Sequence, residues 1–314
     1  MVHIILSRQT AHIAVGLCVL LGFWIGKTYA APPIVRPNYQ ENTLIAPLYF
    51  GPNAFPVPEV LDGRVQKQFK AELAGEYYAG FQGDWTADVL ARVYIPLFTE
   101  RANLTLWMPV MEWYGVPQER AQFCRVPCDS AYMRGHNAGD VYVSTDIQLL
   151  RDKGWYPDIL LRAALKTASG GEYERARTYD APGYFFDLAL GKSLYIKEKN
   201  VSNKPCEKAV ELRLFASAGF LCWQTDRGRQ NDAVMYGVGI LCDSRYVCAR
   251  ATFSGYVGWE NEGDRPMVME GRIAGHIKGF EPFVSYQYGI ADYPFHCVQG
   301  GVCYYWDILK HKKK

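Results

Sequence analysis

Charged side chains of both signs recur at alternate positions along many stretches of this sequence, with apolar side chains between them. In residues 266–279, Glu270, Arg272 and Lys278 occupy even positions, whereas the odd positions are mostly apolar. The charged positions of the first eleven such stretches hold nine carboxylates (Glu72, Glu76, Asp88, Asp140, Asp146, Asp158, Asp187, Glu211 and Glu270) and eight cations (Lys70, Arg92, Arg162, Lys166, Arg213, Arg250, Arg272 and Lys278). Opposite charges on one surface can neutralise each other as ion pairs, or can line a path that selects small solutes.

Alternation with a period of two predicts β-strands, because successive side chains of a strand point to opposite faces. No stretch after residue 30 shows a sustained helical period, so we expect no helix there. The predicted fold class is all-β, with about twelve strands and a range of about ten to fourteen. The predicted strands are 68–81, 86–97, 102–114, 139–150, 157–167, 183–196, 208–223, 232–242, 246–259, 266–279, 282–292 and 302–310.

Three features favour a transmembrane antiparallel β-barrel over a soluble β-protein. The predicted strands are often longer than the five or six residues that are usual in soluble proteins, and a tilted membrane strand needs about 9–11. One face of the strands is charged and the other is almost free of charge. Aromatic residues such as Trp107, Trp113 and Trp306 gather at the ends of the strands, as in the aromatic girdles of membrane barrels. The alternative is a secreted β-sandwich that turns its charged face to water.

The chain divides into three parts. Residues 1–30 are predicted to be a cleaved signal peptide, with Arg8 as the positive flank and Thr28-Tyr29-Ala30 as the cleavage site. Its apolar stretch is short for a membrane-anchoring helix, which is the alternative. Residues 31–65 are predicted to be an irregular Pro-rich leader, periplasmic or luminal, and residues 66–314 the barrel.

Composition excludes two classes of protein. Hydrophobic residues make up 49% of the chain and charged residues 21%, which excludes intrinsic disorder. Lys and Arg number 34 against 32 Asp and Glu, and removal of Arg8 and Lys27 with the signal peptide leaves 32 against 32. A neutral mature chain is not expected to bind nucleic acid through bulk charge.

Over roughly residues 66–310 the chain resembles the outer-membrane β-barrel proteins of Gram-negative bacteria. Residues 139–171, GDVYVSTDIQLL…PDILLRAALKTASGG, are also similar to barrel proteins encoded with the meta-cleavage pathways of phenol degradation, which are proposed transporters. The resemblance implies that the partners are outer-membrane lipid and the barrel-assembly machinery. It also implies short periplasmic links at 98–102 and 279–282 and long external links at 115–138 and 168–182. The chain departs from the barrel pattern at its end, YYWDILKHKKK, where Trp306 or Tyr305 replaces a terminal aromatic or the last strand is misassigned.

A twelve-stranded barrel has a narrow lumen, so the leading functional prediction is a narrow channel or transporter for a small solute. The leader could lie inside such a barrel as a plug. The alternative is a barrel sealed by its charges that acts through its external loops in adhesion, as a receptor or in a structural role. The residues predicted to line the lumen and form a possible constriction are Glu72, Asp88, Arg92, Asp146, Arg162, Arg213, Arg250 and Arg272.

Enzymatic activity is not expected. An outer-membrane lipid hydrolase would need a His-x-Ser pair, and His136-Asn137 is followed by Ala138. Asp140 lies near His136, but such a pair is common by chance. No phosphate-binding loop and no metal-spaced set of ligands occurs, so no cofactor or metal is predicted.

The cysteines predict three local disulfides, because an exported chain meets an oxidising compartment. Each predicted pair brackets a presumed loop. The pairs are Cys124–Cys128, Cys242–Cys248 and Cys297–Cys303.

Overall fold

The structure is a computed structural model. It describes residues 46–97, 100–126, 128, 130–172, 175–179, 181–197, 209–224, 230–259, 261 and 263–306. The predicted signal peptide and the first part of the predicted leader lie outside these residues.

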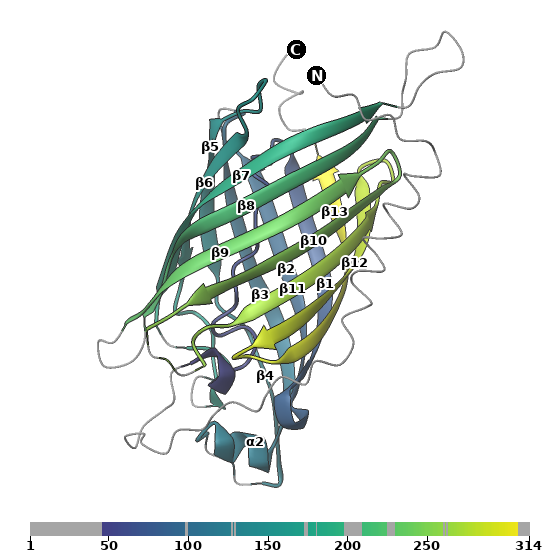
Figure 1. Cartoon of the computed structure of the whole chain (residues 1–314). Helices are drawn as coiled ribbons and strands as arrows, with labels where there is room; N and C mark the ends of the chain where they lie inside the picture. Colours follow the sequence, from purple (N-terminus) through teal and green to yellow (C-terminus); the bar gives the residue numbers. More distant parts are fainter. Residues whose placement is uncertain are drawn as a thin grey trace.

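Twelve antiparallel strands close into one barrel, because β1 pairs with β13 along its whole length (Figure 1). A thirteenth strand, β4, pairs only with the last six residues of β3, where β5 no longer pairs with that strand. The all-β barrel fold predicted from the sequence is therefore confirmed. The strands are β1 (Phe69–Gly80), β2 (Trp85–Pro96), β3 (Ala102–Pro117), β4 (Tyr132–Asn137), β5 (Tyr142–Leu150), β6 (Asp158–Lys166), β7 (Gly183–Lys197), β8 (Ala209–Gln224), β9 (Gln230–Asp243), β10 (Val247–Val257), β11 (Met267–Gly275), β12 (Phe280–Ala291) and β13 (Phe295–Trp306).

The first eleven predicted strands agree with the observed ones to within four residues at either end, but the last prediction was wrong. Residues 302–310 were expected, and the strand is Phe295–Trp306. Gly300 and Gly301 suggested a turn, yet both lie in the strand and pair with β1. A Cβ atom on Gly301 would lie 2.7 Å from the ring of Phe283, so the glycine makes room for that ring inside the barrel.

The prediction of no helix after residue 30 was also wrong. A short helix, α2 (Gln118–Phe123), follows β3, and 3-10 turns lie at η1 (Pro47–Tyr49) and η2 (Phe81–Gly83). Six residues are too few to display a helical period, so α2 leaves no pattern in the sequence. None of the helices in the described part of the chain is long and apolar enough to cross a bilayer.

The outer face of the barrel is apolar and the interior is polar. Leu214 on the outer face of β8 is 52% exposed, whereas its neighbour Arg213 is completely buried inside. The same contrast separates Leu188 from Asp187 on β7. A soluble barrel has the opposite arrangement. The charged side chains of the strands therefore face the lumen. This arrangement excludes the soluble β-sandwich.

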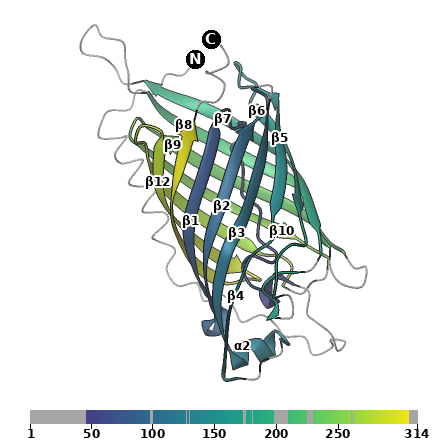
Figure 2. The same cartoon turned by 180° about the vertical axis from the view of Figure 1, so that it is seen from behind.

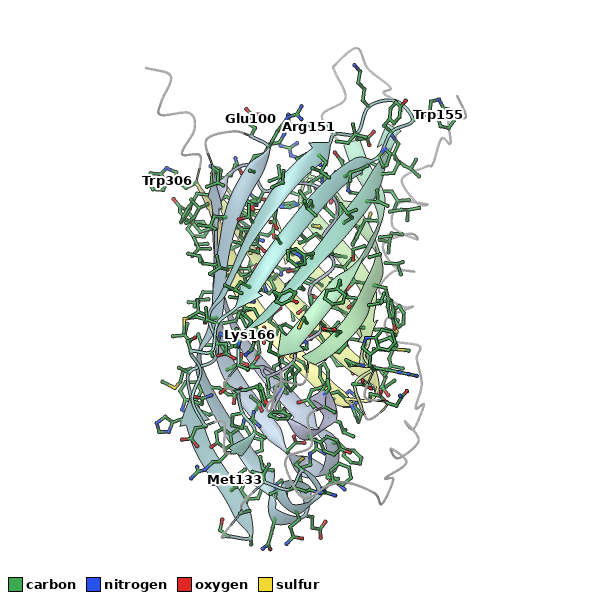
Figure 3. The ribbon with its side chains drawn as sticks, turned by 90° about the vertical axis from the view of Figure 1, so that its left-hand side faces the viewer. Glu100, Met133, Arg151, Trp155, Lys166 and Trp306 are labelled. Carbon is green, nitrogen blue, oxygen red and sulfur yellow. The ribbon has the colours of Figure 1, made fainter. Side chains whose placement is uncertain are left out.

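The two ends of the barrel differ. β1 begins and β13 ends at one end, here called the terminal end, which also carries Glu100 and Arg151 (Figure 3). The opposite end, here called the α2 end, carries α2 and β4 and is marked by Met133 (Figures 2 and 3). The short links 97–101 and 276–279 lie at the terminal end, and the long links that follow β3 and β6 lie at the α2 end. These four links lie at the ends predicted for them, but the rule is not general, because short links also join β1 to β2 and β12 to β13 at the α2 end.

Candidate functional site: the plugged lumen

Residues 46–65, here called the plug, lie inside the barrel. Phe50 and Phe55 are at most 5% exposed and pack in one cluster with Trp223 of β8 and Tyr256 of β10. Pro lacks the amide that strand pairing requires, so this proline-rich segment crosses the lumen without joining the wall. The plug fills space that the inward side chains of the wall leave open.

Hydrogen bonds hold the plug at both ends of the barrel. At the α2 end, Arg120 of α2 donates to the carbonyl oxygen of Leu48, and the amide of Gly51 donates to the Ala176 carbonyl at 2.8 Å. At the terminal end, the Val65 amide donates to Gln148 Oε1 at 2.9 Å. The plug therefore runs from the α2 end to the terminal end and leads directly into β1.

In the middle of the lumen, Glu59 joins the plug to three strands. Its carboxylate accepts from Arg92 Nη1 of β2 at 2.6 Å and from Arg250 Nη1 of β10 at 2.8 Å. Its backbone carbonyl accepts from Arg162 Nη2 of β6 at 2.8 Å. The carboxylate lies within ion-pair distance of both guanidinium groups, and opposite charges at such distances favour its ionised form. Glu59 therefore bridges two strands of the wall across the plug.

A second polar side chain of the plug contacts the wall nearer the α2 end. Asn53 Nδ2 donates to Asp88 Oδ2 at 2.9 Å and to Glu112 Oε2 at 2.6 Å. Glu112 also pairs with Arg177 at 2.7 Å. The plug is thus held by polar contacts along its length, and such contacts can exchange with water when the lumen is wet.

Most lumen cations pair with carboxylates of the wall itself. These pairs join nearby strands and leave the wall close to neutral around them. They are Arg162–Asp187 at 2.6 Å, Lys166–Asp140 at 2.6 Å, Arg213–Asp158 at 2.7 Å, Arg272–Glu72 at 3.3 Å and Lys70–Glu72 at 3.4 Å.

All eight residues predicted to line the lumen point into the barrel, but they do not form one ring of direct cross-lumen pairs. Only Glu72 and Arg272 form an ion pair with each other. Arg92, Arg162 and Arg250 meet through Glu59 of the plug. The other three predicted residues are dispersed along the barrel. Asp88 contacts Asn53 of the plug, and Asp146 lies opposite Arg162 in the β5–β6 register. Arg213 contacts Asp158 and the carbonyl of Asp62.

Sequence reasoning missed Glu59, which connects the plug to β2, β6 and β10. The available signal was its setting, because it is an isolated carboxylate within FPVPEVL, a stretch too apolar for a free linker. Beside Glu59 lies a cavity of about 190 Å³ between plug and wall, lined by residues that include Arg92, Arg272, Glu72, Glu270 and Trp107. Pockets for small-molecule ligands usually measure about 300–1,000 Å³, so the plugged lumen is nearly filled.

His136 and Asp140 do not form a catalytic pair. His136 is exposed on β4, whereas Asp140 is buried in its ion pair with Lys166. Among the described residues, no group of three or more His, Cys, Asp or Glu side chains is arranged to hold a metal ion.

The three predicted disulfides are absent from the structure, and geometry explains two of them. Cys297 and Cys303 both lie on β13, six residues apart, hence about 20 Å apart, whereas a disulfide requires Cα atoms within about 7 Å. Cys242 lies opposite Ala249 and Cys248 opposite Asp243, so the two side chains point to opposite faces of the hairpin.

The third pair, Cys124 and Cys128, consists of two separate thiols. The Cys128 thiol donates to the carbonyl of Ser130, and Cys124 is buried at the end of α2. Burial raises the pKa of Cys124 to about 11. The reactive thiolate is therefore scarce at neutral pH, which disfavours oxidation of this residue.

Peptide mapping of protein alkylated in denaturant without reductant checks the correction for β13. We expect Cys297 and Cys303 each to carry the alkyl group, because one strand cannot bring them together. A peptide in which these two residues are crosslinked would contradict the strand assignment of 295–306.

No protein-family model and no curated protein sequence matches the chain. Solved structures do show a likeness of fold. An outer membrane channel from Pseudomonas putida F1 is 10% identical, with a TM-score of 0.49 over 80% of this chain and 100% of that one. The NanC porin is 8% identical, with a TM-score of 0.46 over 74% of this chain and 98% of that one. The KdgM porin is 10% identical, with a TM-score of 0.44 over 76% and 99% of the two chains.

Proposed function

We propose that this protein is an outer-membrane channel or transporter for a small solute, with the plug as the element that must move during passage. The observation that carries the proposal is the combination of an apolar outer face with a charged lumen occupied by a separate segment. A barrel that served only as a scaffold would be filled by its own wall side chains, as small barrels are. Here the lumen accommodates the whole plug and a remaining cavity.

The apolar exterior is the basis for the membrane location. In a bilayer every backbone group must be paired within the protein, and a closed barrel satisfies this requirement. Half-exposed Trp113 and Trp306 lie near opposite ends of the outer face, where aromatic residues meet lipid headgroups. We place the terminal end in the periplasm and the α2 end outside. Outer-membrane lipid and the barrel-assembly machinery are then the expected partners.

The narrower similarity of residues 139–171 to the barrels of meta-cleavage pathways remains a prediction. These residues form β5, β6 and their flanking links, and they supply Asp146 and Arg162 to the lumen.

A sealed barrel that acts through its outer loops is the second candidate. It is favoured by the extension at the α2 end, where β3 and β4 continue beyond the wall as a hairpin beside α2 (Figure 1). Tyr114, Val116, Ala121 and Met133 form a small core there, so this extension is an ordered surface.

Two measurements test the proposal. Cell fractionation with boiled and unboiled gels is expected to place the chain in the outer membrane with a heat-dependent shift, because closed barrels resist unfolding by detergent. Liposome swelling with small uncharged and charged solutes then separates channel from scaffold. A soluble protein without the shift would contradict the membrane barrel, and a membrane barrel that admits no solute even without its plug would favour the scaffold.

A further inference from the structure

Arg92 and Arg250 differ from the other lumen cations because the carboxylate that pairs with them belongs to the plug and not to the wall. Other cations pair with carboxylates of the wall, as Arg162 does with Asp187. Within the described residues, the carboxylate within ion-pair distance of both Arg92 and Arg250 is Glu59, which belongs to the plug. When the plug leaves, these two guanidinium groups therefore lose the carboxylate that they share, and the wall carboxylates Glu72 and Glu270 remain near them.

The two arginines are held in place independently of Glu59. The guanidinium of Arg92 lies 5.8 Å from the ring centroid of Trp107, and that of Arg250 lies 5.3 Å from that of Phe215. Cations are attracted to aromatic faces at such distances. The recognition site is consequently already formed on the wall.

Neither arginine is saturated by the plug. The Nε atoms of Arg92 and Arg250 are buried and make no hydrogen bond to any described residue. An arginine presents its donors in a planar fork that matches a carboxylate. The cavity beside Glu59 is also lined by Arg92 and Arg272, so a small anion has space next to the position that Glu59 occupies.

We infer that the Glu59 carboxylate occupies the site of an acidic solute, and that a small carboxylate-bearing solute competes with Glu59 for Arg92 and Arg250. This inference rests on the proposed function, because the plug must move for a solute to enter. Wall carboxylates Glu72 and Glu270 line the same cavity and repel anions, so a solute carboxylate is expected to bind only where it contacts the two guanidinium groups directly. In this exchange a carboxylate group of the solute takes the place of the Glu59 carboxylate at the two guanidinium groups.

Titration of the full-length protein in detergent with glutarate tests the inference, with tryptophan fluorescence as the readout because Trp107 lies beside Arg92. Glu59→Gln removes the competing negative charge from the two arginines, so glutarate is expected to bind it at least about tenfold more tightly than it binds the wild type. Adding Arg92→Gln and Arg250→Gln to this variant is expected to abolish binding. Glu59→Ala serves as the second variant, and the heat-dependent gel shift shows that each variant is folded.

Glu211→Gln is the matched control, because it also removes a carboxylate that pairs with the plug, through Arg64 at 3.0 Å. It leaves the arginine pair occupied, so it is expected to bind glutarate as the wild type does. Equal tightening in Glu211→Gln would show that a looser plug, and not the vacated site, causes the effect, which overturns the inference. Binding of uncharged glutaramide or inorganic phosphate as tightly as glutarate would overturn it as well, as would Glu59 variants that bind no better than the wild type.

The test is separable from the test of the proposed function. Glutarate binding to Glu59→Gln, together with no solute passage through an unplugged barrel, would reject the channel and keep the anion site. Passage without glutarate binding would reject the anion site and keep the channel.

Discussion

Deletion of residues 46–62 is expected to convert a nearly closed barrel into a conducting channel. The plug occupies the length of the lumen, and its removal leaves an interior lined by wall side chains that form their own ion pairs. We expect the single-channel conductance in a planar bilayer to rise by about tenfold or more over the wild type, because a water-filled path replaces packed protein. The deletion stops before Gly63 and Val65, which contact Gln148 of β5 and precede β1 in the sequence.

A full-length variant with Asn53→Ala and Glu59→Ala is the control for this deletion. It retains the plug but removes two of its polar anchors, so we expect brief openings of the same amplitude and not a permanently open channel. Unchanged conductance in a deletion variant that still shows the heat-dependent gel shift would reject the plug as the closing element.

Arg213→Ala is expected to cause the largest loss of stability among single substitutions in the lumen. Arg213 is completely buried and donates to Asp158 Oδ2 at 2.7 Å, to Ser193 Oγ at 2.5 Å and to the Asp62 carbonyl at 2.9 Å. Its truncation leaves the buried carboxylate of Asp158 without its cation and removes one of the plug's contacts near the terminal end. Removing one partner of a buried ion pair costs about 3–5 kcal/mol. Urea titration of the folded, heat-modifiable band in detergent measures this loss.

Lys192→Ala is the matched control for Arg213→Ala. Lys192 pairs with Asp152 at 2.5 Å, but both side chains are partly exposed near the terminal end. Exposed ion pairs contribute about 0–1 kcal/mol, so this variant should unfold close to the wild-type urea concentration. Equal destabilisation by the two substitutions would contradict the role of burial at Arg213.

Both predictions depend on the different roles of the wall and the plug inside the lumen. The wall neutralises most of its own charges, so the barrel remains intact when the plug moves. Among the contacts that hold the plug, those of Asn53 and Glu59 are polar contacts that water or a solute can replace. Under the proposed function we therefore expect the wall to stay folded while the plug moves.

The sequence by itself determined eleven of the twelve barrel strands and the two faces of the wall. Alternation along a strand is a local property, and Arg213 beside Leu214 already shows which side chains share a face. Strand length and the density of charge on one face then decided between a membrane barrel and a soluble protein. Alternation could not find α2 or β4, because the helix is too short for a period and β4 pairs only with the extension of β3.

Only the tertiary structure decided which groups meet inside the barrel. Glu59 contacts Arg92, 33 residues away, and Arg250, 191 residues away, and both contacts exist because the sheet closes around the plug. Cys297 and Cys303 bracket what looks like a glycine turn, yet pairing with β1 keeps residues 295–306 extended. Closure of the barrel is a long-range event, whereas the sequence pattern records only local geometry. The sequence pattern therefore predicts the strands of the wall. Only the closed barrel determines which residues of the plug those strands contact.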